Sequence, residues 1–279
     1  MKKMQWTTEA ESAIQKVPFF VRKKVRARVE SEALQNGRGQ ITLAEVEATR
    51  KHYLKGMHAE VKGYQLDSCF GPSGCLNALG SSRELAEKIE NILKDADFLM
   101  FLMSRGVQEP KFHHEFRVSV TDCPNACSQP QIKDIGIIAA RLPQITDSPC
   151  NGCEACAESC REGAVEIGNA DGTPTVDTRR CVACGQCIGA CPGGTLGIAA
   201  EGYRVQLGGK LGRHPRLAQE IDGIFDTDTV LEIIQAAIEV YKKRSAKGER
   251  FGEILKPEDF ATLLRRFGPK ALYRTPARR

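Results

Sequence analysis

The chain has 279 residues, of which 41% are hydrophobic, and a formal net charge of +5. Such a length allows one large domain or two to three small ones, and the hydrophobic content is ordinary for a globular protein with a sizeable core. No apolar run approaches the roughly 18 to 20 residues that cross a bilayer, and the N-terminal sequence MKKMQWTTEAESAIQ lacks the apolar centre of a signal peptide, so we expect a cytoplasmic protein without a membrane span.

The charge and cysteine usage narrow the class of partner. A net charge of +5 does not by itself indicate nucleic acid, and the basic residues gather in two patches, near residues 22–28 and 265–279. The chain contains 12 cysteines. A reducing compartment keeps thiols free for metals, so we expect metal binding, and iron-sulfur chemistry in particular, in place of structural disulfides. No nucleic acid partner is expected.

Residues 6–60 have the pattern of a small helical domain. An amphipathic stretch runs to Pro18 and is followed by a second helix that ends at Asn36-Gly37. Thr42 and Glu45 form a capping box that predicts the start of a third helix. The second helix should carry an apolar stripe, with basic residues on its other faces; the stripe consists of Phe19, Phe20, Val21, Val25 and Val29.

Three segments of this region, WTTEA, VPFFVRKKVRARVE and ITLAEV, resemble the small helical domain at the C-terminus of one subunit of light-independent protochlorophyllide reductase. In that family the domain lies beside a tetrapyrrole substrate, so the resemblance implies a tetrapyrrole-related role. A solvated basic helix without a ligand explains the charge pattern equally well, because charge runs are usually exposed faces. The sequence leaves both interpretations open.

Two cysteine pairs follow at the ends of predicted strands. The strand YQLDSC leads into CFGPSGC, where a Gly-Pro turn separates Cys69 and Cys75 at C-x5-C. The apolar alternation of FRVSVTDCPNAC predicts a strand that delivers Cys123 and Cys127 at C-x3-C, and IGIIAA predicts another strand after it.

This C-x5-C and distant C-x3-C, with CPNAC and DIG around them, resemble the cluster-binding half of siroheme-dependent sulfite and nitrite reductases. The resemblance implies that Cys69, Cys75, Cys123 and Cys127 hold a [4Fe-4S] cluster. It also implies that Cys127 is shared with the iron of siroheme. One shared sulfur leaves the electron almost no distance to cross. Siroheme is therefore a candidate cofactor.

The runs CNGCEACAESC and CVACGQCIGACP repeat one pattern, C-x2-C-x2-C-x3-C. Three thiolates spaced in this way can wrap one corner of an iron-sulfur cube, while the fourth reaches the neighbouring cube. The predicted ligands of one [4Fe-4S] cluster are Cys150, Cys153, Cys156 and Cys191. Those of the other are Cys181, Cys184, Cys187 and Cys160.

The doubled run resembles the bacterial two-cluster ferredoxin module, although Arg161 stands where the first run could have carried a proline. A zinc site or a disulfide framework is the alternative, and neither needs the doubled spacing. Together with the cluster implied for the C-x5-C and C-x3-C motifs, these two clusters use all 12 cysteines of the chain.

The segment GYRVQLGGKLGRHPRLA reads as a strand, a glycine-rich turn and a helix. It resembles the segment after the ferredoxin insert in small dissimilatory-type sulfite reductase chains. Its bases Lys210, Arg213 and His214 could bind a siroheme carboxylate or an oxyanion substrate. A tight strand-helix corner with exposed bases is the alternative. A capping box at Ser81 and Glu84 predicts a helix whose inward face consists of Leu85, Ile89 and Leu93. Further helices are predicted from another capping box at Thr229 and Glu232, and at Pro257.

The chain departs from the reductase pattern in two respects. Complete siroheme reductases have two pseudo-repeated halves, and this chain has one, so we expect siroheme to be absent or its site to be completed by another subunit. Family members commonly carry two lysines eight and six residues before the C-x3-C motif, where this chain has Glu115 and Arg117. Glu115 would repel an oxyanion unless protonated or turned away. His113 and His114 could supply acid catalysis, or could be structural.

We therefore expect an α+β protein with a helical domain over residues 1–62, a half sulfite-reductase-like domain over 63–147 and 198–279, and a ferredoxin insert over 148–197. The leading hypothesis is a redox protein that reduces sulfite or a similar small anion, with a redox partner protein as electron donor and a second subunit or homo-oligomer as a candidate assembly. A non-catalytic three-cluster electron-transfer subunit and a tetrapyrrole-related reductase are the alternatives. The candidate catalytic residues are Arg117, Lys210, Arg213, His113 and His114, and those for siroheme are Cys127, Lys210 and His214.

Overall fold

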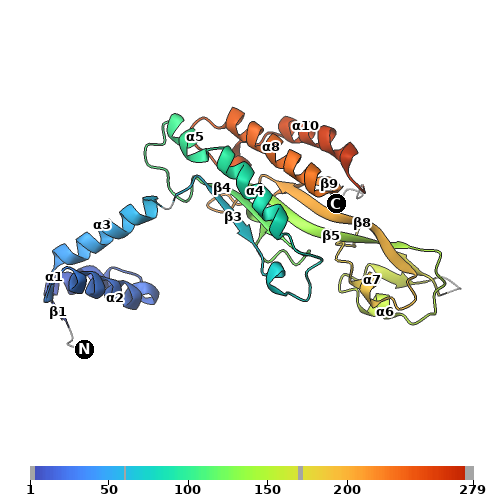
Figure 1. Cartoon of the computed structure of the whole chain (residues 1–279), viewed down its shortest axis with the longest axis horizontal. Coiled ribbons are helices and arrows are strands. Elements are labelled where there is room, and N and C mark those ends of the chain that lie inside the picture. Colours follow the sequence, from blue (N-terminus) through green and yellow to red (C-terminus); the bar gives the residue numbers. More distant parts are fainter. Residues whose placement is uncertain (1–3, 60, 169–171, 274–279) are drawn as a thin grey trace. The chain divides into compact units, whose positions relative to one another are not determined.

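The computed structural model describes residues 4–59, 61–168 and 172–273, and the chain divides into two compact units, Met1–Val61 and Lys62–Arg279 (Figure 1). Within the described residues, no helix is both long and apolar enough to cross a membrane. Helices and a mixed sheet occur together in the second unit, so the predicted α+β class is confirmed.

The first unit packs three helices beside a two-stranded parallel sheet. Its elements are β1 (Gln5–Trp6), α1 (Thr8–Gln15), α2 (Phe19–Gln35), β2 (Gln40–Ile41) and α3 (Leu43–Ala59). The predicted capping box is confirmed, because the Thr42 amide donates to Glu45 Oε2 (2.9 Å) and the Ala44 amide donates to Thr42 Oγ1 (3.2 Å). The predicted end of the second helix is also confirmed, with Asn36 at its C-cap.

The predicted apolar stripe of α2 is only partly right. Val29 is buried, whereas Phe19, the first residue of the helix, is 82% exposed. Several basic residues of α2 are engaged in local contacts: Arg26 donates to both carboxylate oxygens of Glu11 and lies over the ring of Trp6. These contacts explain part of the basic run as packing within the unit.

The second unit is built on a five-stranded sheet with the order β3-β4-β5-β8-β9. Strands β3, β4 and β5 are parallel, and β8 and β9 continue the sheet in antiparallel pairing. The strands are β3 (Tyr64–Ser68), β4 (Phe116–Thr121), β5 (Ile135–Ile145), β8 (Leu196–Leu207) and β9 (Gln219–Phe225). The three strands predicted at YQLDSC, FRVSVT and IGIIAA are thus confirmed as β3, β4 and β5.

Helices cover one face of this sheet (Figure 1). Alternate strand residues such as Val118, Ile137 and Val205 face them and are completely buried in one apolar core. The predicted inward face of helix α4 is confirmed, because Leu85, Ile89 and Leu93 have at most 2% exposure. The helical elements are η1 (Gly71–Ser73), α4 (Arg83–Asp95), α5 (Phe98–Ser104), η2 (Pro130–Ile132), α8 (Thr227–Arg244), α9 (Phe251–Ile254), α10 (Pro257–Phe267) and η3 (Gly268–Lys270).

The two longest strands, β5 and β8, extend beyond the sheet and carry a small lobe between them (Figure 1). This lobe contains α6 (Ala155–Glu158), a two-stranded antiparallel sheet of β6 (Val165–Ile167) and β7 (Pro174–Val176), and α7 (Gln186–Ala190). The cysteines of the doubled run lie in this lobe.

Three local predictions are wrong. The capping box at Ser81 does not form, because Ser82 occupies the N-cap and its amide donates to the distant Asp122 carboxylate (3.2 Å). Helix α8 starts before Thr229, because Asp226 accepts from the Thr229 amide and caps the helix first (2.7 Å). The chain after the glycine-rich turn forms a loop closed by a bridge between Lys210 and Arg216, followed by strand β9, in place of a helix, because the backbone pairs within the loop and then with β8.

Candidate iron-sulfur centres

The core set of cysteines, Cys69, Cys75, Cys123 and Cys127, lies where β3 and β4 end. Parallel neighbouring strands present their carboxyl ends at one edge of a sheet. The Cys69 amide donates to Val120 O (3.2 Å), and the Asp122 amide donates to Cys69 Sγ (3.3 Å). The topology therefore brings the two motifs together.

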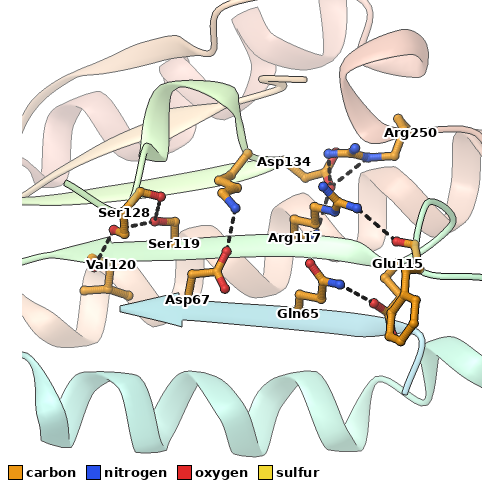
Figure 2. Close-up of polar contacts among 11 residues, drawn as sticks. Gln65, Asp67, Glu115, Arg117, Ser119, Val120, Ser128, Asp134 and Arg250 are labelled. Atoms are coloured by element: carbon orange, nitrogen blue, oxygen red, sulfur yellow. Dashed lines mark hydrogen bonds and ion pairs between the residues drawn. The ribbon is translucent and has the colours of Figure 1, made fainter. Parts of the chain in front are cut away.

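A tight turn joins Cys123 to Cys127. The Ala126 amide donates to Cys123 O (3.2 Å), and Ala126 adopts a left-handed backbone conformation (φ 54°). Ser128 ties the end of this turn back to β4 through Ser119 Oγ (2.7 Å) and Val120 O (3.0 Å), as Figure 2 shows. Both partners are strand residues, so the turn has a rigid support.

The thiols of the core set influence one another. Burial is the main cause that raises the pKa of Cys123, and the Cys127, Cys69 and Cys75 thiols raise this pKa further. Like charges repel, so four thiolates at one place need a cation or a cationic cluster to offset the repulsion. Cys75 and Cys127 are exposed, which leaves one side of the set open.

The second ferredoxin set, Cys160, Cys181, Cys184 and Cys187, lines one small cavity of about 20 Å³. Burial raises the pKa of Cys187 to about 12, and the thiols of Cys181, Cys184 and Cys160 add to the shift. Two runs of the chain thus converge on a single cavity.

The first ferredoxin set consists of Cys150, Cys153, Cys156 and Cys191. Burial is the first cause of the raised pKa of Cys156, and the thiols of Cys191 and Cys150 contribute. Backbone amides lower the pKa of Cys191, with the Leu196 amide as the largest cause. Cys153 lies exposed in the same run.

The donor chemistry of the three sets fits [4Fe-4S] clusters. Each cluster takes four thiolates, and hydrogen bonds to the sulfurs tune its potential. Amides point at sulfur in all three sets: Gly71 to Cys69 (3.3 Å), Ala164 to Cys160 (3.2 Å) and Gly152 to Cys150 (3.5 Å). In the described part of the chain no group of three or more His, Cys, Asp or Glu side chains is arranged to hold a single metal ion.

Arg117, a candidate catalytic residue, belongs to a polar network at the start of β4, whereas the core set lies where that strand ends (Figure 2). Its guanidinium donates to Phe112 O (3.0 Å), and its amide donates to Asp134 Oδ2 (2.8 Å). Asp134 is fully buried and forms an ion pair with Arg250 (2.9 Å). Burial raises the pKa of the Asp134 carboxyl, while the Arg250 charge lowers it. Arg117 is therefore held in place by its neighbours.

Glu115 is turned away into the fold. It is 1% exposed and accepts from the Lys62 amide (3.0 Å) and from Gln65 Nε2 (2.6 Å), which ties the start of β3 to β4. The carboxylate that departs from the family pattern thus has a structural role.

The ring centroids of the neighbouring His113 and His114 lie 4.0 Å apart, and His114 Nδ1 accepts from the Lys111 amide (3.0 Å). Burial is the largest cause that lowers the pKa of His114, and the charge of His113 lowers this pKa further.

The candidates after the glycine-rich turn separate into two kinds. Lys210 is buried and forms an ion pair with Glu253 (2.5 Å), and its backbone pairs with Arg216. Arg213 and His214 are exposed at the tip of the same loop. Among the described residues, the hydrogen bonds and ion pairs of these side chains do not gather them with Arg117 into one cluster of cations.

The sequence reasoning missed Asp134, Arg250 and Arg141. The first two form the buried ion pair, and Arg141 contacts both the lobe and the loop of residues 69–82 between β3 and α4, here called the core loop. The motif DIG contains Asp134, and a lone acid directly before a buried strand was the available signal. Arg250 is more than a hundred residues away and carried no comparable signal.

Two models of known protein families match this chain. The family model described as nitrite and sulphite reductase 4Fe-4S domain matches residues 64–269. The chain belongs to this family. A second model, described as proto-chlorophyllide reductase 57 kD subunit, matches residues 6–50. The two resemblances predicted from the motifs are confirmed by these matches.

Three curated relatives show how much of the chain each likeness covers. Coenzyme F420-dependent sulfite reductase of Methanocaldococcus jannaschii is 31% identical over 205 residues, which are 72% of this chain and 28% of that protein. The beta chain of the dissimilatory-type sulfite reductase of Archaeoglobus fulgidus is 27% identical over 151 residues, 49% of this chain and 41% of that protein. One component of the light-independent protochlorophyllide reductase of Chlorobium phaeovibrioides is 55% identical over 40 residues, 14% of this chain and 8% of that protein.

Among solved structures, dissimilatory sulfite reductase I aligns with 77% of this chain and 54% of its own chain, with a TM-score of 0.49 and 20% identity. The chain spans less than half of the length of each of the three curated relatives.

Proposed function

We propose that this member of the family is an iron-sulfur redox protein that passes electrons through two ferredoxin clusters to a [4Fe-4S] centre coupled to siroheme, where sulfite or a similar small anion is reduced. The observation that supports the proposal is the grouping of the cysteines into three sets, each with a backbone amide that donates to one of its sulfurs. The family membership supports the iron-sulfur part of the proposal.

Each set would hold one cluster, and the clusters would supply single-electron transfer when bound. The protein's own contribution is to fix the sulfurs on rigid turns and to direct amides at them. Residues 148–197 would be the inserted ferredoxin module, residues 63–147 and 198–279 the reductase-like domain, and residues 1–62 the helical domain. In this proposal Cys127, which is exposed at the open side of the core set, is the sulfur shared with siroheme.

The proposal includes two kinds of partner. An electron-donor protein is needed because the clusters carry electrons and do not generate them. A second subunit or a second copy is proposed because relatives are described as subunits of sulfite reductases and because the core set is open on one side.

A non-catalytic electron-transfer subunit is the second candidate, and one observation favours it. Two of the candidate cations already have protein partners: Arg117 donates to Phe112 O and Lys210 pairs with Glu253. A cation that is already paired binds an incoming anion less strongly. A tetrapyrrole-related reductase is the third candidate, motivated by the match of residues 6–50.

An anaerobic absorption spectrum with a turnover assay separates these candidates. A siroheme reductase shows haem bands that clusters lack and oxidises reduced methyl viologen when sulfite or nitrite is added. Arg117→Ala should lower that turnover at least about tenfold if Arg117 binds the anion. Arg83→Ala is the matched control, since Arg83 is exposed on α4. Electron uptake from viologen without haem bands and without turnover would refute the catalytic proposal and leave the electron-transfer subunit.

A further inference from the structure

We propose that Arg141 is a positioning residue that joins the second ferredoxin set to the core set and makes Cys184 the point where electrons leave the lobe. The inference rests on the proposed function, because it takes the presence of three clusters as given. Arg141 lies on β5, in the part of the strand that leads from the sheet to the lobe.

On the lobe side, Arg141 contacts the second cysteine run through both backbone and side chain. Its amide donates to Ala183 O (2.7 Å), and it forms a parallel bridge with Cys184. Gly185 has a left-handed backbone (φ 67°), and a Cβ there would lie 2.9 Å from Arg141 Cδ. The stem of Arg141 therefore packs directly against the backbone beside a proposed cluster ligand.

On the sheet side, the guanidinium reaches the core loop. Arg141 Nη2 donates to Leu79 O (3.0 Å), the Leu79 amide donates to Asp122 O (2.8 Å), and the Asp122 amide donates to Cys69 Sγ (3.3 Å). A short series of hydrogen bonds thus connects the residue beside Cys184 with the core set.

The charge of Arg141 has a consequence for the potentials of the two clusters. The same Nη2 pairs with Glu201 (2.5 Å), whose side chain is 46% exposed, whereas that of Arg141 is 29% exposed. Within the described residues, Arg141 Nε is buried and has no hydrogen-bond partner. A cluster gains a negative charge on reduction, and a nearby cation stabilises the reduced form. Arg141 should therefore raise the reduction potentials of both clusters that flank it.

A second arginine on the neighbouring strand shows what distinguishes Arg141. Arg204 also reaches the second run, with Nη1 3.5 Å from Val182 O, but its guanidinium is held by both carboxylate oxygens of Glu220 (2.6 and 2.5 Å). The hydrogen bonds of the Arg204 side chain thus go to the lobe and to β9, whereas those of Arg141 go to the lobe and to the core loop. The connection between the two sets therefore depends on Arg141.

With clusters bound by the second ferredoxin set and by the core set, Arg141 would support the transfer of one electron from the first of these clusters to the second. No bond forms or breaks, and no proton moves. The electron is replaced from a low-potential one-electron donor, for which reduced methyl viologen serves in the test.

The test uses the anaerobically purified full chain with its clusters, and compares Arg141→Met, Arg141→Lys and Glu201→Gln with Arg179→Met as the control. Arg179 lies in the lobe, is exposed and pairs with Asp177. Redox titration followed by electron paramagnetic resonance gives the potentials, and freeze-quenching after mixing with reduced viologen gives the rate at which the core cluster is reduced.

We expect Arg141→Met to lower the equilibrium constant for reduction of the two flanking clusters about threefold to tenfold, where tenfold equals 59 mV for a one-electron couple. Core reduction should slow at least about tenfold. Glu201→Gln should shift the same potentials upward, because it removes the compensating charge. Arg141→Lys should keep the potentials but slow core reduction, because a single ammonium cannot replace the planar guanidinium at both contacts.

Unchanged potentials and rates in Arg141→Met and Glu201→Gln, at the iron content of the unmodified protein, would overturn the inference. If Arg141→Met loses iron, the upward shift in Glu201→Gln decides, and its absence overturns the inference equally. Fewer than about twelve iron atoms in the unmodified protein would instead refute the three-cluster function, so the two failures are distinguishable.

Discussion

Glu115→Lys separates the family-pattern interpretation of this position from the structural one. The resemblance predicts that a lysine here restores an anion-binding cation and raises turnover. The structure shows Glu115 1% exposed, with two donors at 3.0 and 2.6 Å. Hydrogen bonds to a charged group contribute about 1.5–3 kcal/mol each, so the loss of both should cost at least about 3 kcal/mol. A buried ammonium without a partner adds to that cost.

In a domain of this size, about 3 kcal/mol corresponds to a fall of about 6–12 °C in the unfolding midpoint. The assay is thermal unfolding followed by far-ultraviolet circular dichroism, at one scan rate and matched iron content. Glu109→Lys makes the same change at an exposed position of the preceding loop and should shift stability by no more than about 0.5 kcal/mol. A Glu115→Lys protein as stable as the control, or one with higher sulfite turnover, would refute this reasoning.

Three further changes test other parts of the account. Gly71→Ala should lose about four iron atoms, because its Cβ would lie 2.2 Å from a buried carboxylate oxygen, whereas Gly80→Ala in the same loop has open space and should keep its iron. Cys127→Ser should weaken any siroheme absorption more than Cys69→Ser does, and an unchanged axial-ligand spectrum after Cys127→Ser would contradict the shared sulfur. The lowered pKa of His114 favours its neutral form in the folded protein, so its contribution to stability is present above a pH of about 6.5 and is lost as the pH falls through the folded pKa. His114→Asn should therefore lose less stability between about pH 6.5 and 5 than the unmodified protein, and equal losses in urea titrations would contradict this assignment.

The sequence predicted the elements whose signals are local. Strand alternation in FRVSVT and the helical spacing of Leu85, Ile89 and Leu93 both lie within one element, and the structure has both. The Thr42 capping box involves residues only three positions apart and also forms. The three proposed ligand sets were likewise predicted from the spacing of the cysteines.

Two of the three failed predictions concern places where a distant partner decides the structure. Ser82 caps α4 because of the Asp122 carboxylate, forty residues away, and β9 exists because β8 offers a strand edge. Arg141 could not be recognised, because its role depends on a lobe and a loop that lie on either side of it only in the fold. Local patterns contain no information about such partners.

The most direct test of the central claim is the iron and acid-labile sulfide content of the anaerobically purified chain, with the clusters counted by spin quantification. The account predicts about twelve iron atoms in three cubane clusters, plus one more if siroheme is bound. About eight iron atoms in two clusters would show that the core set holds none, and would contradict the siroheme-coupled centre on which the proposed function rests.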